Sequence, residues 1–328
     1  MGNFNCCLEN KYKKEEKNKI YQINRQKDSK GEEKNNNIKN EYQIISYNIE
    51  DNTLHKYFIK IPILKSMKGI SELNLNSKLY LCGTSTINKD SSSYLFQLNI
   101  KDLTSKIMVN SNYCHYSPSL IAINKDKIIC VGGKKCVGCE IYDISIDHWS
   151  IIPELPEERY KCSLCFDYNN RFLYLFGGIN HENKDFKYIE KDNILRISTK
   201  YYSFPIWEKI YVETKIENRL LNRISSAAIY LGNNIIIIGG KNEEGKKLKN
   251  ISICQINNNK LNIKSSGHQL EFPSKFINQN IFINYSFDKI DENNFFYFFD
   301  CDNKIHIINK QKYMSNLDND DMRLSINS

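Results

Sequence analysis

Two pairs of cysteines have the spacing that zinc sites use. Two residues separate Cys136 from Cys139, and two residues separate Cys162 from Cys165. Four thiolates arranged in this way can hold a tetrahedral zinc ion. In an extended strand, however, residues three apart point to opposite faces. We therefore expect Cys162 and Cys165 to be core residues of a strand. A zinc site at Cys136 and Cys139, on a nearby loop, is the alternative.

The N-terminal residues offer a second kind of chemistry. After removal of Met1, Gly2 would be the free N-terminal residue that N-myristoylation requires, although Cys6 stands where that pattern has Ser or Thr. Cys6 and Cys7 are suited to S-palmitoylation. One acyl chain binds a membrane only marginally, whereas two hold stably. We predict acylation at Gly2, Cys6 and Cys7 and attachment to the cytoplasmic face of a membrane, with an unattached cytosolic protein as the alternative.

Composition narrows the function classes. The net charge is +8, from 46 basic and 38 acidic residues spread along the 328-residue chain, so no nucleic-acid partner is expected. Apolar runs such as Ile235–Ile238 are far shorter than the ~20 residues of a spanning helix. An odd count of 11 cysteines, without an export signal at the N-terminus, favours free thiols in a reducing compartment.

The chain divides into three parts. Residues 1–40 are rich in Lys, Glu and Asn, and we predict a lipid-modified flexible tether there. Residues 314–328 have little apolar content and are expected to form a loose tail. Residues 41–313 hold short apolar segments separated by polar turns, without helical periodicity, so an all-β domain is predicted.

A repeat runs through this middle part. Apolar strands end in glycine pairs at Gly132-Gly133, Gly177-Gly178 and Gly239-Gly240. A polar loop, a further strand and then an aromatic or apolar residue follow each pair. Tyr142 and Trp149 fill the aromatic positions after the first pair, and Trp207 follows the second. Such spacing is typical of propeller blades with loop insertions.

These residues resemble kelch repeats. The resemblance implies a kelch-like β-propeller of six blades, with five or seven also compatible, and aromatic side chains packed between blades. A weaker unit covers Leu79–Gly83, with Cys82 in the place of the first glycine, and a last one includes Phe295–Asp300. Because unpaired sheet edges are a hazard, we expect the strands around Tyr42–Ile61 to share a sheet with the C-terminal strands.

The expected function is that of a non-enzymatic scaffold that binds an unidentified protein partner. Arg159 and Arg223 match the kelch residue before the innermost strand, which implies structural hydrogen bonds, with partner binding as the alternative. The sequence holds no GxSxG, P-loop or GxGxxG motif, and no catalytic residue or cofactor is predicted. An enzyme or a zinc protein built on the same ring is the alternative function.

Overall fold

The computed structural model describes residues 19–25, 41–48, 53–61, 64, 67–76, 78–85, 93–167, 171–182, 185–188, 194–200, 206–212, 223–231, 234–257, 260–274, 281–282, 295–299 and 305–309. The predicted acylation sites Gly2, Cys6 and Cys7 lie outside these residues, and so does the predicted tail 314–328. The regular elements within the described part are β-strands.

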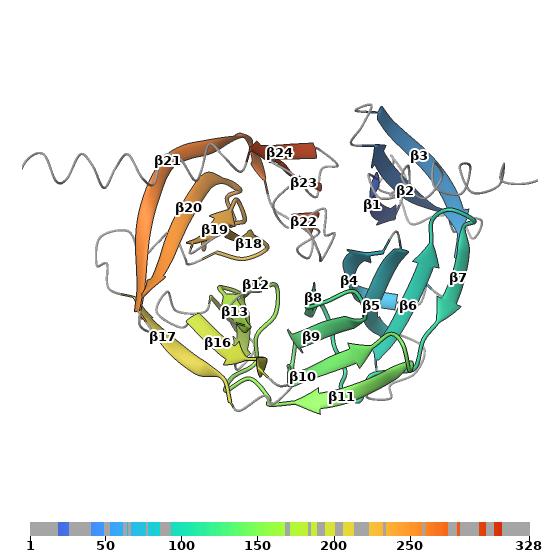
Figure 1. Cartoon of the computed structure of the whole chain (residues 1–328), viewed down its shortest axis with the longest axis horizontal. Helices are drawn as coiled ribbons and strands as arrows, with labels where there is room; N and C mark the ends of the chain where they lie inside the picture. The colour runs from blue at the N-terminus through green and yellow to red at the C-terminus, as the bar shows by residue number, and fades with distance from the viewer. Residues whose placement is uncertain are drawn as a thin grey trace, which may run out of the picture.

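Six groups of antiparallel strands, named blades 1 to 6 in chain order, stand around a common centre (Figure 1). Blade 1 consists of β1–β3, blade 2 of β4–β7 and blade 3 of β8–β11; blade 4 consists of β12, β13, β16 and β17, blade 5 of β18–β21 and blade 6 of β22–β24. The strand bounds are β1 Lys19–Arg25, β2 Glu41–Asn48, β3 Thr53–Lys60, β4 Met67–Leu75, β5 Lys78–Ser85, β6 Ser93–Asn99, β7 Thr104–Ile107, β8 Ser119–Ala122, β9 Lys127–Gly133, β10 Cys136–Asp143, β11 His148–Ile152, β12 Ser163–Asp167, β13 Phe172–Phe176, β14 Ile179–Glu182, β15 Asp185–Tyr188, β16 Ile194–Ser198, β17 Glu208–Val212, β18 Ala227–Leu231, β19 Asn234–Ile238, β20 Leu248–Asn257, β21 Lys260–Ser274, β22 Ile281–Phe282, β23 Phe295–Phe299 and β24 Ile305–Asn309.

Each blade starts near the centre and ends at the rim, as the order of labels in Figure 1 shows. Blades 4 and 5 join into one sheet because β17 pairs in parallel with β21, where Tyr211 faces Lys260. Strands β14 and β15 form a separate hairpin. The predicted all-β propeller is confirmed, and the described strands form six blades.

Blade 1 corrects the prediction of a flexible tether through residue 40. Strand β1 lies inside that segment and pairs along its whole length with β2, so that Ile23 faces Ile44. The side chain of Ile23 is buried in a core with Tyr42 and Ile44. A few apolar residues between Lys- and Asn-rich flanks were too short a signal to predict a strand. Its stability comes from the apolar surface that β2 offers.

The predicted ring closure is also wrong for the described strands. Strands β2 and β3 pair with each other and with β1, while β22–β24 form their own three-stranded sheet. No described C-terminal strand enters blade 1. The expected sharing of a sheet fails because β1 already occupies the free edge of β2.

The hydrophobic cores lie between neighbouring blades. Tyr142 and Trp149 of blade 3 pack with Tyr80 of blade 2, and the rings of Tyr142 and Trp149 are 4.9 Å apart between centroids. The Trp149 indole N–H donates to the carbonyl of Val109, which follows β7 (2.9 Å). In the same way, Trp207 of blade 4 donates to the carbonyl of Pro153, which follows β11 (2.9 Å). The tryptophans therefore connect adjacent blades, as the repeat predicted.

The innermost strands are joined by a regular set of hydrogen bonds. In three of them a serine hydroxyl donates to the backbone carbonyl just before the innermost strand of the next blade: Ser71 within β4 to Pro118 (2.6 Å), Ser119 at the start of β8 to Cys162 (2.9 Å) and Ser163 at the start of β12 to Ser226 (2.8 Å). Ala227 holds the same position in blade 5, opposite Ile238 as Ser163 is opposite Phe176. These bonds fix equivalent positions in blades 2 to 5.

The glycine pairs allow the blades to approach closely. Gly132 has a φ of 62°, and a Cβ atom there would stand 2.4 Å from the carbonyl oxygen of Arg159 in the connection to blade 4. The next amide, that of Gly133, donates to the same carbonyl (3.0 Å). Only glycine combines this backbone conformation with that contact.

The register corrects one detail of the repeat. Cys82 lies opposite Ser71, as Val131 lies opposite Ser119. Gly83, and not Cys82, therefore occupies the position of the first glycine. The prediction for Leu79–Gly83 was therefore wrong by one residue.

Candidate functional site

His115, Arg159 and Arg223 occupy the same position in three consecutive blades, four residues before the first residue of β8, β12 and β18. The described structure buries all three side chains, with exposed fractions of 0%, 0% and 1%. Charged or polar side chains are rarely so buried unless they are hydrogen-bonded. This position is therefore where the ring holds its buried polar groups.

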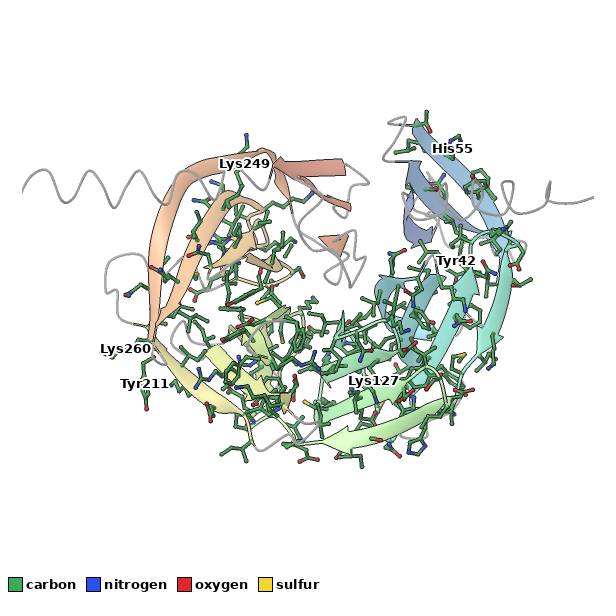
Figure 2. All side chains as sticks on the ribbon, viewed as in Figure 1. Tyr42, His55, Lys127, Tyr211, Lys249 and Lys260 are labelled. Atoms are coloured by element: carbon green, nitrogen blue, oxygen red, sulfur yellow. The ribbon has the colours of Figure 1, made fainter. Side chains whose placement is uncertain are left out.

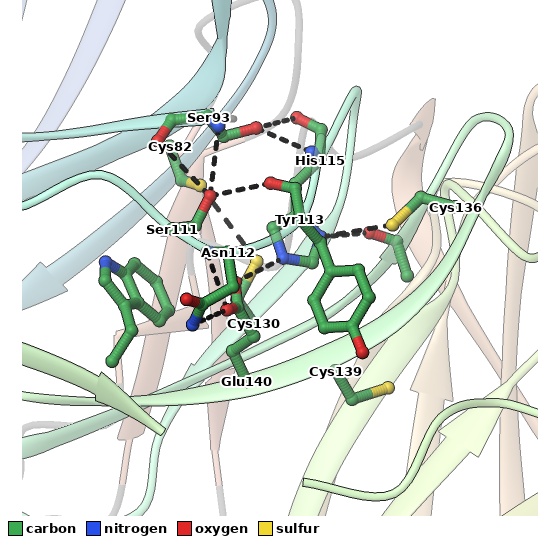
Figure 3. Close-up of polar contacts among 12 residues, drawn as sticks. Cys82, Ser93, Ser111, Asn112, Tyr113, His115, Cys130, Cys136, Cys139 and Glu140 are labelled. Carbon is green, nitrogen blue, oxygen red and sulfur yellow. Dashed lines mark hydrogen bonds and ion pairs between the residues drawn. The ribbon is translucent and has the colours of Figure 1, made fainter. Parts of the chain in front are cut away.

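His115 lies at the junction of blades 2 and 3, between two acceptors (Figure 3). Its Nδ1 atom is 2.6 Å from the carbonyl oxygen of Gly132 and 3.8 Å from the Cys136 sulfur. Its Nε2 atom is 3.0 Å from a carboxylate oxygen of Glu140 on β10. The other Glu140 oxygen accepts hydrogen bonds from the backbone and side-chain amides of Asn112 (2.8 and 2.6 Å).

This geometry defines the charge of both groups. The Gly132 carbonyl can only accept, so Nδ1 must carry a proton. Glu140 receives two N–H donors on one oxygen and presents the other oxygen to Nε2. Burial by itself would lower the pKa of His115, but its contacts with Cys136 and Glu140 raise it to about 10. His115 and Glu140 are thus a fully buried ion pair.

The same loop is held to blade 2. The Ser93 hydroxyl on β6 donates to the carbonyl of His115 and accepts from its amide (3.2 and 2.6 Å). Ser111 donates to the carbonyl of Tyr113 (2.7 Å). The loop that carries His115 is therefore bonded to blade 2 through Ser93 and to blade 3 through Glu140.

In blade 5, Arg223 makes the contacts that His115 makes in blade 3, with different chemical groups. Arg223 donates to the carbonyl of Gly239, which corresponds to Gly132, at 3.0 Å. It also donates to the hydroxyl of Ser252 (2.9 Å), which faces Ile237 as Glu140 faces Cys130. Burial lowers the pKa of Arg223 to about 10, far above neutral pH.

Arg159 pairs with Glu157, its guanidinium donating at 2.8 Å. Since the side chains of Arg159 and Arg223 are both enclosed, neither reaches the surface of this structure. The alternative that they contact a partner has no surface to act through. Arg223 holds the backbone at Gly239, whereas Arg159 holds the side chain of Glu157.

Cys162 and Cys165, the second pair with the spacing of zinc ligands, point in opposite directions. Cys162 packs in the core between blades 3 and 4, and Cys165 packs in the core between blades 4 and 5. This is the arrangement predicted from strand geometry. Burial raises the pKa of the Cys162 thiol to about 12 and raises that of Cys165 as well.

The first pair was predicted on a loop, and this is wrong. Strand β10 begins at Cys136, which faces Gly133, and Cys139 faces Val131 after an irregularity in the register. The glycine pair ends in a tight turn, so pairing resumes earlier than the polar sequence suggested. Burial raises the pKa of Cys139, which disfavours the thiolate that zinc requires. In the described part of the chain, no three His, Cys, Asp or Glu side chains form a group that could hold a metal ion.

An apolar patch lies on the rim where blades 2 and 3 meet. Asp147, in the turn between β10 and β11, accepts a hydrogen bond from the Val109 amide (3.0 Å). This contact brings Ile146 beside the end of β7. Ile107, Val109 and Ile146, named here the rim patch, are 50%, 45% and 67% exposed. Other exposed apolar residues lie on outer strands, among them Leu54, Tyr57 and Phe58 on β3 and Tyr211 on β17, which is labelled in Figure 2.

The comparisons with known proteins bear on the fold alone. No family model matches the sequence, and no curated protein matches it. Among solved structures, "Structure of YjhT" is similar, with a TM-score of 0.54 and 14% identity over 76% of this chain and 81% of that chain. No helix within the described residues is long and apolar enough to cross a membrane. The chain has a β-propeller fold, and its polar junctions are built to hold the blades together.

Proposed function

We propose that this chain is a kelch-like, non-enzymatic scaffold that binds a protein partner and is tethered to the cytoplasmic face of a membrane by N-terminal acylation. The observation that carries the scaffold role is the rim patch. Its three side chains are aliphatic and exposed, and the bond from the Val109 amide to Asp147 joins the segments that carry them. A partner that covers them would remove apolar surface from water.

Hydrogen bonds around Asp147 hold the turn of the rim patch in place, which favours binding of a partner. Tyr142 donates to Asp147 (2.7 Å), and Asp147 also accepts from Val109 and Lys106. Ile146 is thereby held in a turn that is bonded to two strands. A surface that is rigid before binding costs less entropy to dock.

The rim patch is tested by crosslinking. A photoreactive amino acid in place of Ile146 should give one discrete crosslinked product with a cellular protein. The same replacement at Ile206, another exposed isoleucine on blade 4, is the matched control. Ile107→Lys should abolish the product at 146 while the far-ultraviolet spectrum stays unchanged. Equal products at 146 and 206, or a product that persists in Ile107→Lys, would contradict the proposal.

The tether rests on the sequence of the N-terminus. Gly2 is placed for myristoylation, and Cys6 and Cys7 would supply the second acyl chain that stable anchoring needs. Metabolic labelling with a myristate analogue should mark the wild type and not Gly2→Ala. Labelling with a palmitate analogue should be lost when Cys6 and Cys7 are both changed to Ser. Myristate label retained in Gly2→Ala would refute acylation at that residue.

A further inference from the structure

Two buried thiols face each other across the junction of blades 2 and 3. Cys82 on β5 and Cys130 on β9 are both fully buried, and their sulfur atoms are 4.0 Å apart (Figure 3). They belong to different blades and lie in one apolar core with Tyr80 and Leu95. Their side chains therefore already point at one another.

Equivalent positions at the next two junctions, where the structure describes both blades, hold no such pair. The register places Val131 and Leu175 there between blades 3 and 4, and both lie in the core of that junction. Phe176 and Ile237 fill the same places between blades 4 and 5. The fold asks only for apolar bulk at these two positions. Of the three junctions compared, the one between blades 2 and 3 holds paired thiols, which add a chemistry that packing does not require.

The surroundings act differently on the two sulfur atoms. A hydrogen bond from Cys130 lowers the pKa of Cys82, and the nearby His115 acts in the same direction. Burial raises the pKa of Cys130 well above its usual range. Cys82 is therefore the more readily ionised of the two, and a thiolate is the attacking species in thiol oxidation.

We propose that Cys82 and Cys130 are a modification site at which a small peroxide forms a disulfide between blades 2 and 3. The Cys82 sulfur attacks one peroxide oxygen, the O–O bond breaks, and a sulfenic acid and water result. The Cys130 sulfur then attacks the Cys82 sulfur, the S–S bond forms, and a second water leaves. Two thiols are oxidised, and one hydrogen peroxide is reduced to two waters.

The disulfide would connect neighbouring blades through their shared core. It closes a chain loop that contains all of β6, β7 and β8. Closing a loop of this size restricts the unfolded chain and stabilises the folded one. Because both sulfurs are enclosed, the reaction needs an oxidant as small as hydrogen peroxide and should be slower than oxidation of the exposed Cys114.

The test is mass mapping of the full chain after treatment with hydrogen peroxide. Free thiols are alkylated in denaturant, and the digest is examined without reduction. We expect a crosslinked peptide pair from β5 and β9, and a midpoint of thermal unfolding higher by about 5 °C or more that dithiothreitol reverses. Recovery of both residues as alkylated thiols, while Cys114 is oxidised, would overturn the proposal. A disulfide from either residue to Cys136 would do the same.

Two variants separate the disulfide from general oxidation. Cys82→Val copies Val131 at the equivalent position, so it should fold, form no crosslink and show no thermal shift. Cys165→Val removes a buried thiol from the core between blades 4 and 5 and should keep both effects. A thermal shift that persists in Cys82→Val would show that the stabilisation has another source. The wild-type mapping decides the proposal even where a variant does not fold.

Discussion

Raising the pH from 6.5 to 8 should destabilise this protein through a single buried group, His115. Its pKa is about 10 in the folded chain, against 6.5 when unperturbed. A group with a raised folded pKa contributes stability that is complete below the unfolded pKa and is lost as the pH rises towards the folded one. Because the unfolded imidazole is half protonated at pH 6.5, the loss rises towards about 1.4 kcal/mol per pH unit across this window and totals about 1.6 kcal/mol from pH 6.5 to 8.

The assay is urea unfolding followed by the fluorescence of Trp149 and Trp207, the two tryptophans of the chain. The window ends at pH 8 because unfolded cysteines begin to ionise above it. Glu140→Gln should remove the dependence, since a glutamine can donate to a neutral His115 and still accept from Asn112. Glu154→Gln, which removes a charge from an exposed residue, should keep it.

The reasoning would be refuted by a free energy of unfolding that is flat between pH 6.5 and 8 in the wild type. The same slope in Glu140→Gln as in the wild type would show that another group titrates. Nuclear magnetic resonance would identify the titrating group directly: the imidazole of His115 should show no titration below pH 8 in the wild type. In Glu140→Gln the same resonance should titrate near or below pH 6.5.

Four further substitutions test the contacts between and within the blades. Gly132→Ala should lower the free energy of unfolding by about 3 kcal/mol, because its Cβ would overlap the connection to the next blade. Gly245 has open space around it, so Gly245→Ala should lower the free energy of unfolding by only about 1 kcal/mol, through backbone strain. Both are measured by urea unfolding, and equal losses would contradict the close approach. Ser163→Ala should cost about 1 kcal/mol in the same assay, and no loss would mean that the bond between innermost strands does not stabilise the ring. Tyr142→Phe should raise the pKa of Asp147, because the hydrogen bond from the Tyr142 hydroxyl is the main cause of its lowered pKa. An unchanged titration of the Asp147 carboxyl carbon in a nuclear magnetic resonance experiment would contradict that bond.

The parts of the fold that repeat could be predicted from the sequence. Glycine pairs such as Gly132-Gly133 and aromatics such as Trp149 recur because each blade must meet the next in the same way. The opposite directions of Cys162 and Cys165 followed from strand geometry alone. Features that depend on local pattern could therefore be predicted from the sequence.

The remaining features depend on contacts between distant segments. Strand β1 is stable only against β2, and its short apolar content gave no signal of its own. The roles of His115 and Glu140 arise where one blade meets the loop before the next, so neither residue stood out. The spacing of His115 four residues before Ser119, shared by Arg159 and Ser163, was the signal that could have found it.

The most direct test of the central claim combines the tether and the rim patch. The photoreactive amino acid is placed at Ile146, and the crosslinked product is measured in the membrane and soluble fractions. In the otherwise wild-type chain the product should be found on the membrane. With Gly2→Ala the product should form equally well but appear in the soluble fraction. A product that stays on the membrane in Gly2→Ala, or that never forms at this position, would contradict a lipid-tethered scaffold.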